Sequence, residues 1–217
     1  MASESASTLT PTDHAVTALS SRLRAETLAE HEHAERRPFI AQLMRGELTL
    51  GDYTRYLAQL SYVYEALEAR TSRPGEPAAL NDPRLHRSAA IANDLRALGV
   101  VDATAEHPPL AATLAYADRI RAAGEAHLFL AHHYTRYLGD LSGGQVVATM
   151  IARHYGATPE QLTFSRFEFI DKPVVFKREY REMLDRINLT DEQSDLLVEE
   201  TKEAYRANSA LFDALAR

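Results

Sequence analysis

The stretch YLGDLSGGQ combines a carboxylate with residues that are rare inside helices. Gly139, Gly143 and Gly144 are three of the nine glycines in the chain, and each costs a helix roughly 1 kcal/mol relative to alanine. Gly139 and Gly143 share a helical face, which fits either close packing of a second helix or a flat ligand lying on bare backbone. Asp140 and Ser142 compete for backbone hydrogen bonds. The stretch therefore favours a kinked helix beside a small polar cavity.

One histidine is a candidate metal ligand opposite such a surface. Any one of the nine histidines is more often a surface or core residue, but His31 has Glu35 four residues later on the same helical face. A carboxylate there can accept a hydrogen bond from the ring nitrogen that does not bind metal. Arg24, two turns before His31 and ~10 Å along the axis, suits the carboxylate edge of a tetrapyrrole. Lys177 and Arg181 suit carboxylates or a protein partner, and ordinary solvated side chains explain all three cations equally well.

Helices account for almost the whole chain and must position these residues. Pro38 suits a helical first turn and Gly46 a helix end, while the capping-box patterns at 158–161 and 190–193 begin helices. Only 164–170 reads as β-like, and 72–83 reads as a loop. We predict an all-α, single-domain bundle of about eight helices. The main predicted helices span 13–35, 38–45, 50–71, 84–98, 109–123, 125–155, 174–187 and 191–215.

Composition limits the classes of function. The chain has 217 residues, a net charge of −7 and no cysteine. An acidic chain argues against general nucleic-acid binding, which needs a basic face. Without cysteine there is no disulfide, thiolate metal site or cysteine nucleophile. We expect residues 1–12 to be a mobile tail and 13–217 one domain, with no signal peptide or membrane span. A cytoplasmic location is compatible with this composition.

Four segments together resemble one enzyme family. The segment YTRYLGDLSGGQ (134–145) resembles the signature of haem oxygenases, and its pattern is similar to that of the soluble bacterial type. The segments HEHAE (31–35), YEALE (64–68) and KREYR (177–181) match further parts of the family pattern, so the likeness covers roughly residues 15–215. The resemblance implies a helical bundle in which haem is sandwiched between a proximal helix and a kinked, glycine-rich distal helix.

The resemblance also implies a role for each matching residue. His31 would be the proximal iron ligand, supported by Glu35. On the distal side, Asp140 would organise a water network that Tyr64 and Arg136 join. These three residues, with the glycines above, form the expected catalytic group.

Other matching residues are expected to seat the haem. Gly139 and Gly143 would lie over its distal face. Tyr205 departs from the pattern, which has phenylalanine at that wall, and the position of ring opening is sensitive to haem seating. The residues implied to hold or line the haem are Arg24, Phe39, Tyr134, Ser142, Gly144, Lys177, Arg181 and Phe212.

The implied reaction is oxidative ring opening of haem b, which is both substrate and oxygen-activating cofactor. Its products are biliverdin, carbon monoxide and ferrous iron. The chain has no dinucleotide, flavin or iron–sulfur motif, so electrons must come from an external ferredoxin or NAD(P)H-dependent reductase. We expect no nucleic-acid or membrane partner. The cations expected to dock an acidic donor are Arg36, Arg37, Lys177, Arg178 and Arg181.

Three alternatives compete with this interpretation. A di-iron bundle needs two Glu-x-x-His pairs, and only Glu30 and His33 form one. Thiaminase-like proteins share a related fold but need a cysteine nucleophile. The strongest alternative is a protein that stores, carries or senses haem without degrading it. The group Gly139, Asp140 and Gly143 favours the enzyme, because oxygen chemistry needs it and haem storage does not.

Overall fold

The chain folds into helices joined by short connections. The computed structural model describes residues 18–71, 73–74 and 76–216, and this part of the chain contains no β-strand. The predicted tail at 1–12 and the predicted helix start at residue 13 lie outside the described residues. The α-helices are α1 (Leu19–Glu26), α2 (Leu28–Glu35), α3 (Pro38–Arg45), α4 (Leu50–Glu68), α5 (Ser88–Ala97), α6 (Ala103–Glu106), α7 (Ala111–Ala122), α8 (Ala126–His133), α9 (Gln145–Tyr155), α10 (Pro173–Arg186) and α11 (Asp191–Leu215).

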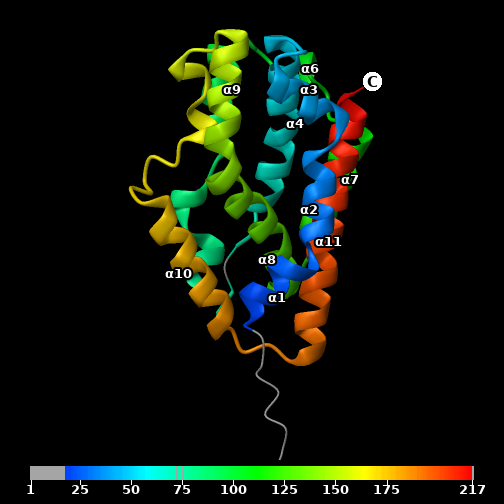
Figure 1. Cartoon of the computed structure of the whole chain (residues 1–217), viewed down its shortest axis with the longest axis vertical. Coiled ribbons are helices and arrows are strands. Elements are labelled where there is room, and N and C mark those ends of the chain that lie inside the picture. Colours follow the sequence, from blue (N-terminus) through cyan, green and yellow to red (C-terminus); the bar gives the residue numbers. More distant parts are fainter. Residues whose placement is uncertain (1–17, 72, 75, 217) are drawn as a thin grey trace, which may run out of the picture.

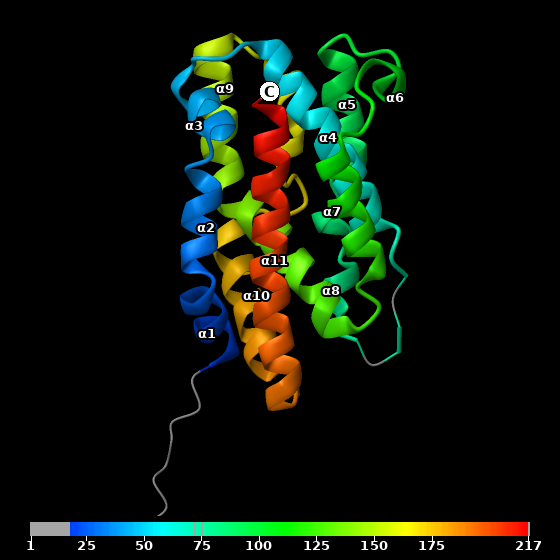
Figure 2. The ribbon, with the colours of Figure 1, turned by 90° about the vertical axis from the view of Figure 1, so that its right-hand side faces the viewer.

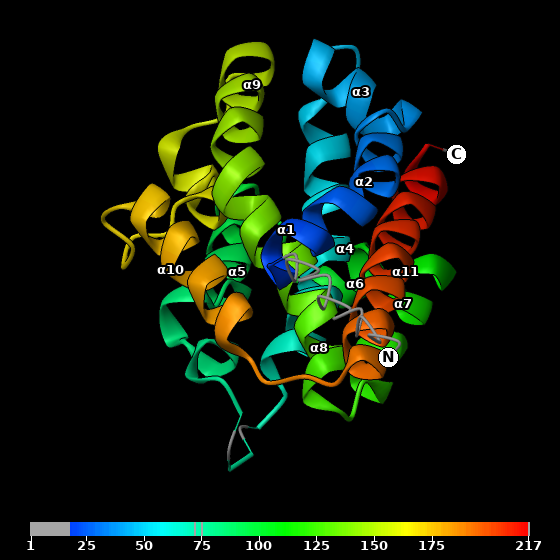
Figure 3. The ribbon, with the colours of Figure 1, turned by 60° about the horizontal axis from the view of Figure 1, so that its bottom comes forward.

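The helices form two sides with a space between them. Figure 1 shows α9 and α10 along one side and α2, α3 and α11 along the other. The long helix α11 packs against α8, α2 and α7 (Figure 2), and α4 packs against α7 and α5. Seen from below, α1 lies between the two sides (Figure 3). No helix within the described ranges is long and apolar enough to cross a membrane.

Several helix ends follow the sequence signals. Gly46 ends α3 with φ of +76°, and a Cβ atom there would lie 2.7 Å from Cγ of His154, so only glycine fits. The Thr49 side chain accepts a hydrogen bond from the Asp52 amide at 3.2 Å at the start of α4. The predicted box at Thr190 begins α11 in the same way. These caps confirm the predicted starts and ends of α3 and α11.

The helix predicted over 13–35 is divided at Thr27. Its hydroxyl donates to the carbonyl of Leu23 at 2.7 Å, and its backbone has φ −109° and ψ 3°, outside the α-helical range. Back-bonding of this kind bends helices. The prediction of one continuous helix is therefore wrong, and α1 meets α2 at a bend.

Two other predictions fail for tertiary reasons. The helix predicted over 84–98 begins only at Ser88, because Glu68 accepts hydrogen bonds from the Arg87 and Ser88 amides. The residues before it form short 3₁₀ turns, η1 (Ala78–Asn81) and η2 (Pro83–Leu85). The β-like stretch at 164–170 contains no strand.

The connection after α9 also differs from the prediction because of a tertiary contact. It contains two 3₁₀ turns, η5 (Pro159–Gln161) and η6 (Thr163–Ser165). The carboxylate of Asp94 accepts from the Phe164 amide at 2.8 Å and holds the second turn against α5. The capping-box pattern at 158–161 therefore begins only a single turn and not a helix.

The helix predicted over 125–155 is present, but its middle is not α-helical. After α8 the chain forms two π-helical turns, η3 (Tyr134–Leu138) and η4 (Asp140–Gly144), before α9 begins. We call residues 134–144 the π segment. In a π turn each N–H bonds five residues back, which widens the helix, and such turns are frequent at functional sites. At the glycines, where the sequence predicts a kinked helix, the structure has this widened π-helical segment.

Candidate active site

Two adjoining cavities lie between α2 and the π segment. The inner cavity has a volume of about 160 Å³ and the outer cavity about 440 Å³. The outer one opens toward α1 and α10, which supply Arg24 and Arg181 to its lining. Residues that line both cavities are His31, Glu35, Gly139, Gly143 and Tyr205. Because the two cavities share these five residues, we treat them as the inner and outer halves of one cavity, which we call the slot.

The two shared glycines face open space. A Cβ atom built at Gly139 or Gly143 would meet no described heavy atom within 4 Å. At Gly144 a Cβ atom would lie 3.8 Å from Cβ of Asp140 and 3.9 Å from Oγ of Ser165. These are ordinary van der Waals distances, so close packing explains none of the three glycines. Of the two explanations that the sequence left open, bare backbone facing a ligand is the one that fits Gly139 and Gly143.

A polar cluster lies at the inner end of the slot. Asp140 Oδ1 is 3.2 Å from Arg136 Nη2, while the buried Oδ2 has no hydrogen-bond partner among the described residues. Arg136 also donates to Asn208 Oδ1 at 3.0 Å and to the Tyr64 hydroxyl at 3.4 Å. Burial raises the pKa of the Asp140 carboxyl well above its usual range, despite the nearby guanidinium. Burial therefore favours the protonated form of this carboxyl group.

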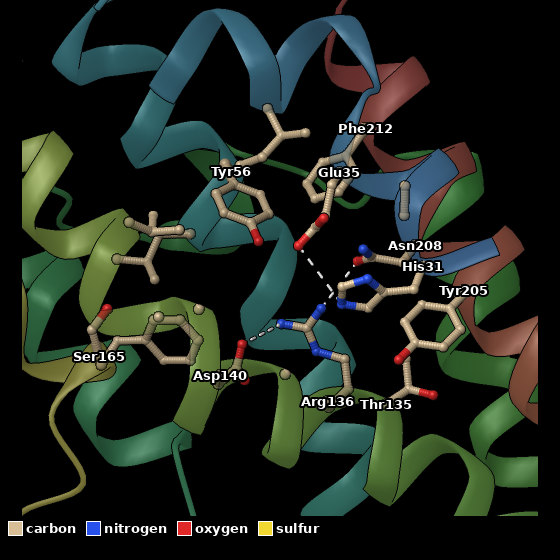
Figure 4. A pocket seen from close by; sticks show the side chains of 18 of the residues that line it. His31, Glu35, Tyr56, Thr135, Arg136, Asp140, Ser165, Tyr205, Asn208 and Phe212 are labelled. Atoms are coloured by element: carbon tan, nitrogen blue, oxygen red, sulfur yellow. Dashed lines mark hydrogen bonds and ion pairs between the residues drawn. The ribbon is translucent and has the colours of Figure 1, made fainter. Parts of the chain in front are cut away.

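The opposite wall carries His31. Figure 4 shows its ring facing the Arg136–Asp140 pair across the cavity. His31 Nε2 is 3.7 Å from Glu35 Oε1, too far for a hydrogen bond, so the hydrogen bond expected from the sequence is not made. Glu35 is the last residue of α2 and its side chain is 67% exposed. Water therefore competes for its carboxylate. The pair remains within ion-pair distance.

The neighbouring His33 faces another way. Its Nε2 lies 3.1 Å from Arg37 Nη1, and it lines a separate groove with Glu30 and Arg206. Two positions along a helix turn a residue by about 200°, so His33 points away from the face of His31. This leaves His31 as the histidine that lines the slot within the described residues.

Cations gather at the outer end of the slot. Arg24, Tyr134, Ser142 and Arg181 all line the outer cavity. Burial raises the pKa of Tyr134, while Arg181 and Arg24 act against this rise. Lys177 does not line the cavity, because its Nζ donates to Ser142 Oγ at 3.1 Å. Three of the four residues predicted to hold the ligand's carboxylates, Arg24, Tyr134 and Arg181, thus line this cavity, and the fourth, Lys177, is held just outside.

Two residues expected at the cavity lie behind its wall. Phe39 is 1% exposed and packs against Phe212, with ring centroids 6.4 Å apart. Phe212 itself lines the inner cavity. Tyr64 is completely buried and reaches the polar cluster only through Arg136. Neither Phe39 nor Tyr64 lines either cavity, because a first layer of side chains from the π segment and α11 stands in front of them.

The sequence reasoning missed residues that complete the inner wall. Asn208 holds Arg136, and Tyr56, Thr135 and Ser165 also line the inner cavity. Asn208 precedes Phe212 by four residues, so both share one face of α11. A polar residue on the inward face beside an expected pocket residue was a usable signal. Nothing in the pattern around Ser165 marks its position at the cavity.

The arrangement fits a flat, metal-bearing ligand with carboxylates. An imidazole stands on one side of the slot and bare backbone on the other, where a side chain would occupy the ligand's place. Arg24 and Arg181 suit carboxylates at the outer end. The Oδ2 of Asp140 has no partner among the described residues and can bond a polar group supplied by a ligand or by water.

Comparison with known proteins gives a consistent result. The family model described as Heme oxygenase matches residues 17–214. A curated "Heme oxygenase 1" from Gallus gallus is 34% identical over 207 residues, which cover 92% of this chain and 70% of that protein. The solved haem oxygenase from Leptospira interrogans is 33% identical with a TM-score of 0.85, covering 90% of this chain and 98% of that one. The cyanobacterial Synechocystis heme oxygenase, solved in complex with heme, is 30% identical with a TM-score of 0.84, and 91% of each chain is covered.

Proposed function

Because the chain belongs to the haem oxygenase family, we propose that it opens the haem ring oxidatively, giving biliverdin, carbon monoxide and ferrous iron. The observation that carries this proposal is the bare backbone at Gly139 and Gly143 beside the buried Asp140. A haem carrier or sensor, the alternative function, needs neither feature. The enzyme is therefore the function that the site supports better.

The residues present fit haem. His31 would bind the iron, and Arg24, Tyr134 and Arg181 would hold the carboxylates. Lys177 would join them by leaving Ser142. When bound, haem supplies the iron centre that binds and activates oxygen.

Asp140 is the group that would handle protons. Its Oδ1 is fixed by Arg136, which Tyr64 and Asn208 hold in turn. Its Oδ2 is free to bond a water molecule in the cavity. Because burial raises the pKa of this carboxyl, its protonated form is favoured, and this form can donate a proton to that water molecule. Positioned acids of this kind contribute about 10²–10⁴-fold to rates.

The two glycines of this wall disfavour peroxidase chemistry. Peroxidase chemistry uses distal side chains to split the O–O bond, and no histidine of the described π segment stands there. Arg136 is the one cation lining the inner cavity, and it is already bonded to Asp140 and Asn208. With only backbone close to the ligand's face, oxygen chemistry would be directed at the ring itself.

An external donor would supply electrons at the outer end of the slot. Of the cations expected to dock it, Arg36 is paired with Glu32 at 2.7 Å and Arg37 is paired with Asp213. Lys177 and Arg181 remain beside the slot and would contribute most. We propose an acidic ferredoxin or reductase as the partner, and the cytoplasm as the place where such reduced donors are available.

Charge reversal tests the docking surface. Arg178→Glu should raise the donor's KM and flatten its salt dependence, because a cation near the slot is replaced by an anion. Arg37→Glu should do the same more weakly, because the Arg37 side chain is 27% exposed against 66% for Arg178, which is itself paired with Glu182. Unchanged donor kinetics in both variants would remove this surface.

The function itself is tested by adding one equivalent of haemin to the purified protein, followed by a reductant in air. Loss of the Soret band, appearance of biliverdin and trapped carbon monoxide are the expected results. A stable Soret band that only cycles between ferric, ferrous and oxygenated forms would favour the carrier or sensor.

A further inference from the structure

Tyr205 of α11 stands at the junction of the slot. It lines both the inner and the outer cavity. Its ring meets the His31 ring edge to face, with centroids 5.4 Å apart and an interplanar angle of 86°. A phenylalanine would make the same ring contact. The hydroxyl group is therefore the part of Tyr205 that packing against His31 does not explain.

The hydroxyl is an unused donor inside the slot. Among the described residues it makes no hydrogen bond, although most of the side chain is buried. Burial raises the pKa of Tyr205, and the nearby Tyr134 and Tyr116 add to the rise. The group therefore remains a neutral O–H donor at physiological pH. Figure 4 shows the hydroxyl directed away from α11 toward Thr135 of the π segment.

Besides His31, the ligand-holding groups that share a cavity with Tyr205 are those of the outer end. Tyr205 lines the outer cavity together with Arg24, Tyr134 and Arg181. Those three groups suit carboxylates, and the carboxylates are the only strong hydrogen-bond acceptors on the rim of haem. The rest of the rim carries apolar methyl and vinyl groups. A hydroxyl group in this place would therefore be satisfied by some rotations of the ring and left unsatisfied by others.

We propose that the Tyr205 hydroxyl is a positioning group that fixes the rotation of haem in the slot by donating a hydrogen bond to one of its carboxylates. The inference rests on the proposed function, because it requires haem in this slot. It assigns to Tyr205 a part in choosing which bridge carbon of the ring faces the bare backbone at Gly139 and Gly143. That choice decides the biliverdin isomer.

The test compares Tyr205→Phe with Tyr62→Phe. The control removes a hydroxyl that bonds the His107 carbonyl at 3.3 Å, on a residue that lines neither cavity. Proton NMR of the cyanide complex of each ferric haem-loaded protein reports seating through the haem methyl shifts. The rate of haem transfer to an apo-globin acceptor reports the lost hydrogen bond. A thermal melt of each apo protein confirms folding.

We expect Tyr205→Phe to keep histidine ligation but to show shifted or doubled haem methyl signals. Haem release should be roughly ten-fold faster, and the biliverdin should become a mixture of isomers. Tyr62→Phe should match the wild type. Superimposable methyl spectra and equal release rates for Tyr205→Phe would overturn the proposal. A wild-type protein that forms no saturable haem complex would overturn the proposed function as well, so the two failures are distinct.

Discussion

The two walls of the slot are built in opposite ways. The wall formed by α2 is a regular helix that presents one functional side chain, His31, with Glu35 open to solvent. The π segment abandons regular helix, presents bare backbone at Gly139 and Gly143, and buries Asp140 and Arg136. Holding a ligand thus needs one side chain on an ordinary helix. Directing a reaction at the ligand's face needs side chains removed and polar groups kept out of water.

The largest effect should come from removing the acid of the π segment. Asp140→Ala should keep haem affinity and His31 ligation but lower the ring-opening rate by about 10²–10⁴-fold, because the proton source is lost. Single-turnover absorbance measurements of biliverdin formation would show this. Asp118→Ala, at an exposed aspartate, is the control. Ring opening at the normal rate in Asp140→Ala would mean that the proton comes from elsewhere.

The next effect concerns the opposite wall. His31→Ala should abolish the five-coordinate histidine–iron spectrum, while the pocket walls still bind some haem. We expect the loss of affinity to be at least as large as the roughly 10–100-fold cost of removing a partner that only supports a metal ligand. His33→Ala, two residues away on another face, should leave the spectrum unchanged. If His31→Ala retains axial histidine ligation, the ligand is a different histidine.

A smaller effect is expected at Gly139 in the π segment, where one substitution should raise the stability of the apo protein and lower its affinity for haem. Gly139 has φ −59° and ψ −51° and open space at its Cβ position. Gly139→Ala should therefore stabilise the apo protein by about 0.4–1 kcal/mol and weaken haem binding by roughly ten-fold, or ~1.4 kcal/mol. Chemical denaturation and haem titration measure the two quantities.

Gly51→Ala is the matched control for this prediction. Gly51 lies in α4, where a Cβ atom would make only an ordinary contact of 3.5 Å with Thr49 Oγ1. It should gain stability without weakening haem binding. If Gly139→Ala binds haem as tightly as the wild type, the bare backbone at this position is not a ligand surface.

A last prediction concerns stability alone and tests the buried polar groups beside the π segment. Burial lowers the pKa of His133 to about 3, and its Nδ1 lies 2.7 Å from the Tyr180 hydroxyl. Between this value and the unfolded value of about 6.5, only the unfolded chain takes up the proton. Stability should therefore fall as the pH falls through this window, by roughly 1.4 kcal/mol per pH unit. In His133→Gln the slope should be shallower, as measured by urea unfolding across the window, and equal slopes would contradict the prediction.

The sequence was most informative where the determinants are local. Pro38, Gly46 and the Thr190 cap mark helix ends through their own backbone chemistry, and they were predicted correctly. The slot-facing glycines were recognisable because three glycines in one helix are costly. The resemblance placed His31, Arg24 and Tyr134 on one site, and the structure brings them together there.

The failures involve partners that are distant in sequence. Glu68 moves the start of α5 to Ser88 from a helix earlier in the chain, and no local pattern marks that contact. Phe39 carries the residue type of a pocket wall but lies one layer too deep, since depth depends on how α3 packs on α11. Asn208 carried a usable signal beside Phe212, but its role as the partner of Arg136 depends on how α11 packs against the π segment.

The π segment also sets how this stretch of sequence can change. Each π turn holds one residue more than an α-helical turn would, so the segment behaves as two insertions within a helix. Each inserted residue turns everything after it by about 100°. Deleting both would straighten the helix but rotate α9 by about 200°, carrying the fully buried Ile151 toward solvent. A lineage of such proteins could therefore replace residues of this segment that do not face the slot, yet could not shorten it without also changing the inward face of α9.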